Sequence, residues 1–374
     1  MKQHFLLIGL FIYTLQLSAQ DPTFSQFFNS RTYMNPAAVA MDGGLTVNGT
    51  YRNQWNQIPG KFESQFLSVE ALSCLGSAFG VHILHDSEGE GLLNTLSAGL
   101  DYAYLIGGEG QLRLGFGAAW YQKWVNWDAL IFSDQLDAKD GAVLPSQADR
   151  LYDVKPSGLG FKAGFVYTKP PETKNGTSFS FGAGVTHLGN IRLNERTREG
   201  FYDANPIALR FSVFGEVVLP FFRFTGPGYL ITVIPQFKYE QQSTLKTTSV
   251  GVTGHYNSFS LGVFYQNNLP WGDLNNTDAM SLYFGFLQTP NKNMLIEYGI
   301  SYDTNNVPEF GRSNLGGQTG GVIELSVKLH FKGASIFCNA KKPRMNKNGK
   351  VNCPSPKGRH VNEWYKNQKR KNLN

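Results

Sequence analysis

The stretch that decides the fold runs from Gly110 to Trp124 and reads GQLRLGFGAAWYQKW. Its apolar side chains recur at every second position, from Leu112 through Phe116 to Trp120, with Arg113 and small residues between them. A period of two predicts a β-strand with one apolar face. The stretch exceeds the roughly five or six residues usual in soluble sheets and suits a tilted strand that crosses a membrane, which needs ~9–11 residues.

The same alternation returns along most of the chain. Between residues 205 and 219, Leu209 and Phe211 fall on one face, and Arg210 and Glu216 fall on the other. In all, the sequence predicts fourteen antiparallel strands, at 44–54, 62–71, 75–86, 92–106, 110–124, 156–169, 177–189, 205–219, 228–241, 245–256, 259–268, 278–289, 292–303 and 320–331. An even number of strands is typical of single-chain bacterial outer-membrane barrels. We therefore expect an all-β fold, a transmembrane outer-membrane β-barrel.

The connections between these strands alternate in length. Links after the odd-numbered strands run 7, 5, 31, 15, 3, 9 and 16 residues, whereas links after the even-numbered strands run 3, 3, 7, 8, 2 and 2. Long loops at one end and short turns at the other are the outer-membrane pattern, with the short turns in the periplasm. Both chain termini are then expected on the periplasmic side. Pro235 removes a ladder donor inside the ninth strand, so we expect a bulge or a shifted boundary there.

The composition suits strands that face lipid. Charged residues make up 17 % of the chain, against about 25 % in an ordinary soluble domain. No apolar run approaches the ~18 residues of a membrane helix, which excludes a multi-helix membrane protein. The net charge of +6 divides unevenly, because residues 332–374 carry +11 and residues 20–331 carry −6.

The first nineteen residues predict export. Lys2 precedes the apolar run FLLIGLFIYTLQL at 5–17, and Ala19 is a small residue at the expected cleavage point. The signal peptide is thus 1–19, and the mature chain divides into a segment 20–43, the barrel 44–331 and a basic tail 332–374. Residues 20–43 precede the first strand, so they form either a periplasmic segment or a plug in the lumen.

Polar and aromatic side chains suggest what lies inside and at the rims of the barrel. The predicted lumen-facing charges carry both signs, which favours a plugged or cross-paired interior over an ion-selective pore. They are Glu70, Asp101, Arg113, Lys162, Arg210, Glu216, Glu240, Glu297, Glu324 and Lys328. Aromatic residues near strand ends predict an interfacial girdle. These are Trp55, Tyr121, Trp124, Trp127 and Trp271.

No enzyme constellation is evident. The histidines on the predicted strands lack metal-ligand spacing, and a pairing of His187 with Ser180 is less plausible than a packed barrel histidine. The acidic run 86–90 is too short for a dedicated calcium loop and is better explained as a solvated turn. We expect no catalysis, no cofactor and no metal.

Several motifs resemble the PorP/SprF family of Bacteroidota outer-membrane proteins. The predicted mature chain begins with Gln20 followed by DPTFSQF, and YMNPA follows at 33–37. The residues of this N-terminal motif are Asp21, Pro22, Phe24, Ser25, Gln26, Asn35 and Pro36. Further matching runs are YRNQW at 51–55, FSDQLD at 132–137 and GAGVTHL at 182–188. The aromatic Phe331 that ends the last strand is similar to the signal read by the outer-membrane assembly machinery.

The resemblance implies a role in type IX secretion and gliding motility. Such a protein is a scaffold for the secretion or cell-surface attachment of a large adhesin, and it is linked in the periplasm to an OmpA-like peptidoglycan-binding lipoprotein. Outer-membrane lipid is the remaining expected partner, and nucleic acid is not one. A passive or substrate-selective channel with the same fold is the alternative function, and a lipid-active barrel enzyme is a third.

Many of the matching residues fall at strand ends next to the long loops. We hypothesise that this rim, with loop 125–155, holds the exported partner; a girdle with loop-folding residues is the competing interpretation. The partner-binding residues are Arg52, Trp55, Asp86, Trp124, Trp127, Asp128, Asp134 and His187.

The tail 332–374 departs from a chain that ends at its last strand. It is rich in Lys, Arg and Asn and cannot build a core, so it is either disordered or bound to anionic lipid or an acidic periplasmic protein. Cys338 and Cys353 are able to close a disulfide around the basic run, and Cys74 competes for either.

Overall fold

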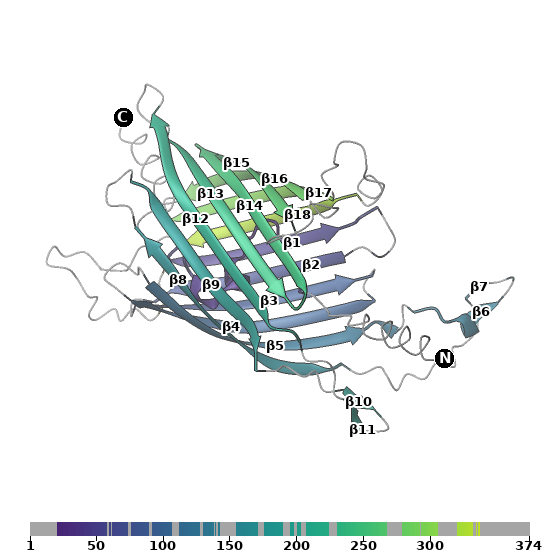
Figure 1. Ribbon diagram of the computed structural model, residues 1–374. Helices are drawn as coiled ribbons and strands as arrows, with labels where there is room; N and C mark the ends of the chain where they lie inside the picture. Colours follow the sequence, from purple (N-terminus) through teal and green to yellow (C-terminus); the bar gives the residue numbers. More distant parts are fainter. Residues whose placement is uncertain are drawn as a thin grey trace, which may run out of the picture.

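The computed structural model forms one closed β-barrel (Figure 1). It describes residues 21–57, 60, 62–73, 76–89, 92–106, 112–127, 130–137, 139, 141–142, 155–170, 176–189, 195–197, 200–202, 207–223, 230–267, 279–291, 293–305, 320–331, 334 and 336. Cys74, Cys338, Cys353 and nearly all of the tail lie outside these residues, and so does the predicted disulfide. Among the residues described, no helix has the length and hydropathy of a membrane span.

Fourteen antiparallel strands make the wall, so the predicted fold class is confirmed. They are β1 (Leu45–Gln54), β2 (Phe62–Leu72), β3 (Ser77–Glu88), β4 (Leu93–Ile106), β5 (Leu112–Val125), β8 (Ser157–Lys169), β9 (Ser178–Leu188), β12 (Arg210–Arg223), β13 (Leu230–Gln242), β14 (Leu245–Tyr256), β15 (Phe259–Asn267), β16 (Ala279–Asn291), β17 (Met294–Asn305) and β18 (Val322–Phe331). Each pairs with its neighbour in the chain order, and β1 pairs with β18 from Leu45↔Phe331 to Gln54↔Val322. Closure leaves the wall with no free sheet edge, as a membrane requires.

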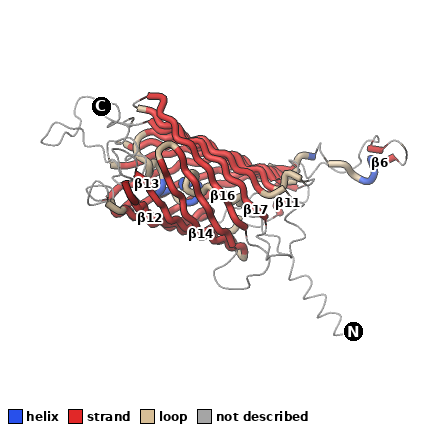
Figure 2. The backbone as a smooth tube through the Cα atoms, turned by 90° about the horizontal axis from the view of Figure 1, so that it is seen from above, coloured by secondary structure: helices blue, strands red, loops and turns tan. Residues whose placement is uncertain are grey.

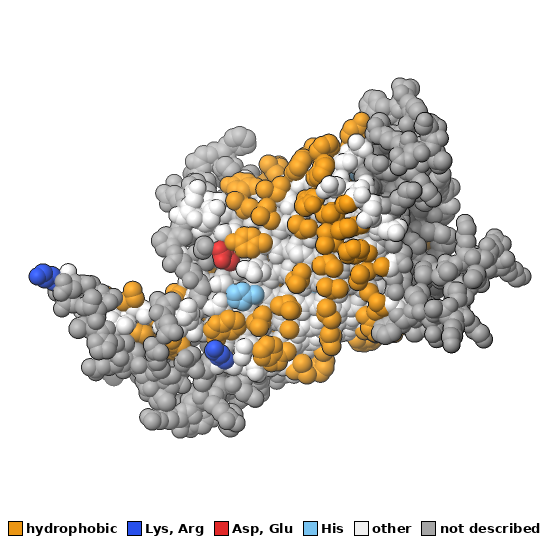
Figure 3. Space-filling view, turned by 180° about the vertical axis from the view of Figure 1, so that it is seen from behind, with side chains coloured by type: hydrophobic (Ala, Val, Ile, Leu, Met, Phe, Trp, Pro, Cys, Tyr) orange, Lys and Arg blue, Asp and Glu red, His pale blue; other side chains and the backbone are white. Residues whose placement is uncertain are grey.

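The two faces of the wall differ as the alternation predicts. Large apolar side chains point outward, such as Phe116 (61 % exposed), Leu261 (65 %) and Ile300 (46 %). Figure 3 shows them spread over the wall with few charges among them. Of the ten charged residues predicted to face the lumen, nine are buried and Lys328 is half-buried.

Pro235 lies inside β13, and the predicted bulge or boundary shift is wrong. Its pairing with Val252 of β14 belongs to a continuous ladder. Toward β12 the ladder is interrupted between Glu216↔Gln236 and Leu219↔Val233, but the register is the same on both sides of the gap. The barrel thus accommodates the missing N–H by losing pairs locally rather than by inserting a residue.

The two ends of the barrel are distinct. The long-loop end is defined by the last residues of β1, β3, β5, β9, β13, β15 and β17, and it carries the links 126–156, 189–209 and 306–321. Two small hairpins lie in these links, β6 (Leu136–Asp137) with β7 (Gly141–Ala142), and β10 (Glu195–Thr197) with β11 (Gly200–Tyr202). The short-turn end is the opposite one, where a two-residue turn such as 257–258 suffices.

Residues 21–43 lie inside the barrel and are called the plug below. The plug contains two short helices, α2 (Arg31–Met34) and η1 (Pro36–Ala38), which are seen as blue segments within the wall (Figure 2). Between Phe24 and Met41, seventeen of its residues are buried. The sequence left open whether this segment is periplasmic or luminal, and the described part is luminal.

Candidate functional site

The plug runs lengthwise through the lumen. At the long-loop end, the N–H of Asp21 donates to Oε1 of Gln242 at the end of β13 (2.8 Å), and its carboxylate lies 3.2 Å from Nε2 of His187 at the end of β9. At the short-turn end, Asp42 lies 3.3 Å from Nζ of Lys328. The plug therefore spans the lumen between the two mouths before the chain enters β1.

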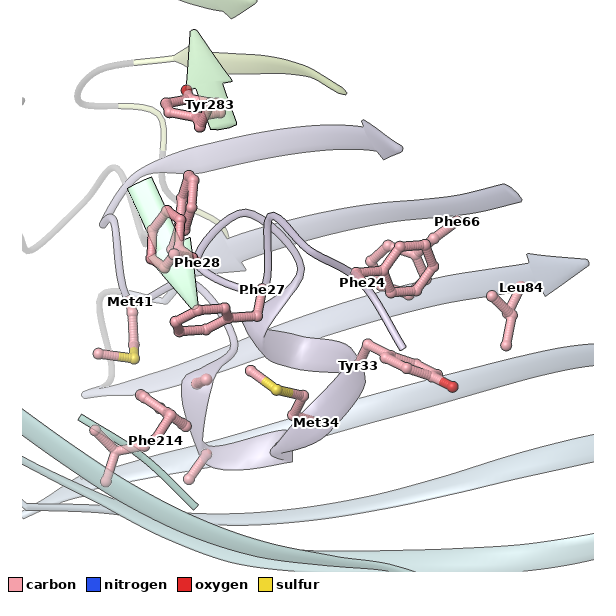
Figure 4. Close-up of a cluster of buried hydrophobic side chains, with 14 residues drawn as sticks. Phe24, Phe27, Phe28, Tyr33, Met34, Met41, Phe66, Leu84, Phe214 and Tyr283 are labelled. Atoms are coloured by element: carbon pink, nitrogen blue, oxygen red, sulfur yellow. The ribbon is translucent and has the colours of Figure 1, made fainter. Parts of the chain in front are cut away.

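Aromatic side chains form the apolar centre of the plug (Figure 4). Phe28 stacks on Phe264 of β15 at 5.7 Å and meets the edge of Tyr283 of β16 at 5.0 Å. On the other side, Phe24 packs against Phe66 of β2 at 5.9 Å. Such ring pairs contribute about 0.5–1.5 kcal/mol each beyond the burial of their area. The plug is thus bound by a core of its own, shared with the wall.

Asn35 and Pro36 fix a tight turn at the centre of the plug. The Asn35 amide donates to the carbonyls of Phe165 and Ala183 at 3.0 Å each, and its Oδ1 accepts the N–H of Ala37 at 2.9 Å. Asn35 therefore caps the helix η1 and joins it to the wall with one side chain. Pro36 begins η1, where its missing N–H costs no hydrogen bond.

The wall facing this turn consists of glycines. A Cβ at Gly115 would lie 2.0 Å from the backbone nitrogen of Ala37, and one at Gly164 would lie 2.3 Å from Oδ1 of Asn35. A Cβ at Gly184 would lie 2.8 Å from the carbonyl oxygen of Met34. These three glycines of β5, β8 and β9, the glycine cradle, let the plug approach the wall to backbone contact.

A buried carboxylate on β18 holds the first part of the plug. Glu324 accepts the N–H groups of Ser25 (2.8 Å) and Gln26 (2.9 Å). Arg52 of β1 donates to Oγ of Ser25 (2.8 Å) and lies 3.4 Å and 3.5 Å from the carboxylates of Asp303 and Glu324. The Ser25 hydroxyl in turn donates to Asp303. Arg52 is thus the cation that compensates two buried acids, which would otherwise be strongly unfavourable.

A second charged cluster surrounds the start of the plug. Arg210 of β12 pairs with Glu240, lies 3.5 Å from Asp21 and stands 4.2 Å above the ring of Tyr33. The Tyr33 hydroxyl donates to the carbonyl of Pro22 at 2.9 Å.

Charged wall residues also bind the second half of the plug. Arg113 donates to the carbonyls of Ala37 (2.9 Å) and Val39. Glu70 accepts the N–H of Ala40 at 2.7 Å, where the backbone has a positive φ of 49°. Arg31 of the plug pairs with Glu216 at 2.5 Å. The predicted luminal charges therefore largely serve to hold the plug.

Three of the residues predicted for the rim lie near the long-loop ends of β1, β3 and β9, but their side chains point into the lumen. Arg52, Asp86 and His187 have buried side chains on the lumen side. Asp86 accepts from Ser64 at 2.5 Å, and the other two contact Ser25 and Asp21 of the plug. The alternation of the strands places all three inward, so plug and wall residues surround these side chains.

The other predicted rim residues are more peripheral. Trp124 stacks on His85 (5.9 Å), Trp127 stacks on Phe132 (6.0 Å), and Trp55 meets the edge of Phe62 (5.1 Å). Asp134 is exposed in the short helix η3 (Ser133–Gln135). Asp128 and Trp271 lie outside the described residues. Tyr121 was assigned to the girdle wrongly, because it is buried in the lumen against His187 at 5.0 Å.

The predicted N-terminal motif proves to be part of the plug. Asp21, Pro22, Phe24, Ser25, Gln26, Asn35 and Pro36 all lie in it. Sequence reasoning missed that Glu324, Arg210 and Arg113 are their partners, and it missed the glycine cradle entirely. The alternation identifies which residues face inward, but contacts between residues nearly 300 positions apart leave no local signal.

Among the described residues, two of the cavities lie between plug and wall. One, of about 40 Å³, is lined by Arg31, Glu216, Glu297 and Lys328 among others, and the second, of about 20 Å³, lies near Asp21. Volumes of this size accommodate only a few water molecules. No group of three or more His, Cys, Asp or Glu residues suited to a metal occurs in the part of the chain that the structure covers.

A family of known proteins matches most of this chain. The family model for the type IX secretion system membrane protein PorP/SprF matches residues 16–329. No curated protein matches the chain.

Similar solved structures include the CymD monoaromatic hydrocarbon channel, with 13 % identity, a TM-score of 0.45, and coverage of 82 % of this chain and 93 % of that one. A Pseudomonas aeruginosa FadL homologue has 14 % identity, a TM-score of 0.39 and coverages of 81 % and 94 %. CdiB from Acinetobacter baumannii has 10 % identity, a TM-score of 0.41 and coverages of 77 % and 60 %.

Proposed function

Because the chain belongs to the PorP/SprF family of type IX secretion system membrane proteins, we propose that it is a plugged outer-membrane scaffold for the export or surface attachment of a large adhesin. The observation that carries this proposal is the lumen occupied by residues 21–43 and bound there by Glu324, Arg210 and Arg113. A lumen filled in this way is unsuited to passing solutes, whereas the mouth of the barrel remains available to a partner. The role is non-enzymatic.

The long-loop end faces the cell exterior in this proposal. The support is the contrast between links such as 126–156 and turns such as 257–258. The end of β18 then lies at the periplasmic mouth, where the tail follows. Asp21, however, lies at the outer mouth, so the expectation that both termini are periplasmic is kept only for the C-terminal side.

The loop after β5 is the surface proposed to hold the adhesin. Ile131 (66 % exposed) and Leu136 (55 % exposed) lie in it, beyond the last residue of the strand. In the same loop, Trp127 stacks on Phe132, and Asp134, which lies between Ile131 and Leu136 in the sequence, is exposed. Exposed apolar side chains outside the lipid-facing wall are typical of protein interaction sites.

The periplasmic partner is proposed to be an OmpA-like peptidoglycan-binding lipoprotein. The support is the family together with the charge of +11 on residues 332–374. A basic segment attracts an acidic protein surface over about one Debye length, ~8 Å at physiological ionic strength.

The test replaces residues 131–142 by a Gly-Ser linker of equal length and measures the large protein retained on the cell surface. The matched control replaces residues 195–202, which carry the other small hairpin at the same end. We expect the first variant to lose most of the retained protein at an unchanged level of barrel in the outer membrane, and the control to keep it. Full retention in the first variant would contradict the proposed attachment surface.

A further inference from the structure

We propose that the lumen wall is a peptide-binding site, and that the plug is a tethered ligand able to leave and rebind through the long-loop mouth. This inference concerns the barrel and its own N-terminal segment, and it holds whether or not an adhesin is the exported partner. The supporting observations are the hydrogen bonds and side-chain contacts between the wall and the plug.

The wall binds the plug's main chain along most of its length, in addition to the plug's side chains. Side chains of seven wall residues bond to backbone groups of the plug: Gln242 to Asp21, Lys238 to Phe24, Glu324 to Ser25 and Gln26, Asn48 to Asn29, Ser212 to Met34, Arg113 to Ala37 and Val39, and Glu70 to Ala40. Arg52 donates to the side-chain hydroxyl of Ser25. Hydrogen bonds to the main chain contribute affinity whatever the side chains of a bound peptide are, while pockets for side chains give specificity.

Two features of the wall supply such specificity. The glycine cradle accepts the turn at Asn35 only if residue 37 is small, because Ala37 is fully buried against Gly115. Phe66, Phe264 and Tyr283 receive the plug's phenylalanines. The ligand class is therefore a peptide with aromatic residues ahead of an Asn-Pro-Ala turn.

The wall does not depend on the plug for its strand pairing. Every one of the fourteen strands is paired on both sides by other strands, including β1 with β18. The plug contributes no strand to the sheet in the region described. Its departure leaves the backbone ladder intact and exposes to water both the polar wall residues and the apolar ones that contact the plug, such as Phe66 and Phe264.

The geometry also sets the direction of departure. The plug is continuous with β1 at the short-turn end through Gly43 and Gly44, whose φ values are 75° and 68°. The Asp21 end lies at the opposite mouth, with its carboxylate 20 % exposed. Residues 21–42, when extended, reach up to about 70 Å, which is longer than the ~30 Å of a bilayer's hydrocarbon core. A released plug thus extends beyond the long-loop mouth while its other end stays attached.

Peptide exchange tests the binding site on the full chain. A protease site inserted between Asp42 and Gly43 allows the plug to be cut after the barrel has folded. Cut and uncut protein are then mixed with a fluorescent synthetic peptide of residues 20–42, and uptake is followed by anisotropy. A second peptide carries Ala37→Trp, which the glycine cradle should reject.

We expect the cut protein to take up the first peptide at least tenfold more than the uncut protein does, and at least tenfold more than it takes up the Ala37→Trp peptide. Absence of uptake, or equal uptake of both peptides, would overturn the proposal. Loss of the heat-sensitive mobility of the folded barrel after cutting and dilution would overturn it as well.

Epitope tags test the direction separately. One variant carries a tag between Gln20 and Asp21, and another carries the same tag within residues 143–154 of the long loop. We expect antibody to reach both tags from the same side of the outer membrane. Tags found on opposite sides would refute departure through the long-loop mouth, whereas both tags on the inside would refute only the orientation proposed above.

Discussion

Gly115 decides, as a single residue, how closely the plug can approach the wall. Its Cα faces the backbone of Ala37, and a Cβ would come within 2.0 Å of that nitrogen. The Cβ and the backbone nitrogen of Ala37 are both fixed by the main chain, so a rotamer change cannot relieve their contact. Because Gly115 lies on the luminal face of β5, a larger residue there acts on the plug and not on the lipid-facing surface.

We therefore predict that Gly115→Val displaces the plug and lowers the free energy of unfolding by about 1–3 kcal/mol, as overpacking does. Urea unfolding in detergent and limited proteolysis of residues 21–43 measure the two effects. The matched control is Gly49→Val, because the nearest atom to a Cβ at Gly49 is 4.0 Å away, on Leu67. Equal protease resistance in both variants would show that the cradle does not hold the plug.

Arg52 offers a second prediction at this scale. Its guanidinium is the cation beside the carboxylates of Asp303 and Glu324. Arg52→Met therefore removes the positive charge that compensates these two buried acids. We expect a loss of about 3–5 kcal/mol of stability. Adding Glu324→Gln should restore part of this loss, because one of the two acids becomes neutral. A double-mutant cycle with no coupling between the two positions would exclude this account of the cluster.

The sequence alone predicted which side chains face the lumen, but not which residues of the plug they contact. The alternation placed Arg113, Arg210 and Glu324 in the lumen, where the structure has them. The same rule places Arg52 and His187 inward too, near the long-loop ends of β1 and β9. Which residue they contact depends on a plug with no periodic pattern of its own.

At the scale of elements, the strands were the most predictable part. Each of the fourteen predicted ranges overlaps an observed strand, because every strand has one lipid-facing apolar side that imposes the period of two. The plug's helices α2 and η1 were not predicted. They are 4 and 3 residues long, too short for a helical periodicity, and they exist because Asn35 and the wall satisfy their ends.

Pro235 gives a prediction at the element scale. It interrupts the ladder between β12 and β13 from an exposed, outward-facing position. Replacement by Val restores a donor and suits a lipid-facing site, so Pro235→Val should raise stability by about 0.5–1.5 kcal/mol, the net value of one hydrogen bond. The urea midpoint, with an unchanged slope, is the measurement. A lower midpoint would mean that the gap is required by the curvature of the wall.

At the scale of the whole molecule, the fold explains where the charges of the chain lie. The net charge of +6 combines −6 on residues 20–331, +11 on the tail and +1 from Lys2, and the charges of the barrel are concentrated in the lumen. Acidic and basic wall residues are there paired with one another and with the plug, as in Arg210 with Glu240 and Asp21. The same charges would make an unplugged lumen hydrophilic and conducting.

The tail gives a whole-molecule prediction that is independent of the plug. If residues 332–374 act through their positive charge, co-purification of a periplasmic partner should weaken steadily as salt rises from about 0.05 to 0.5 M, because screening shortens the range of attraction. A variant with six of the tail's lysines changed to Gln should show the same loss at low salt. Co-purification that is insensitive to both changes would exclude a charge-driven contact.

The central claim is that the plug closes the lumen, and single-channel conductance tests it most directly. The chain with the protease site between Asp42 and Gly43 is recorded in a planar bilayer before cutting, and again after cutting and washing out of the plug. The account predicts a nearly silent barrel before cutting and discrete, lasting openings afterwards. An intact barrel that already conducts like a porin, with no change when the plug is removed, would contradict it.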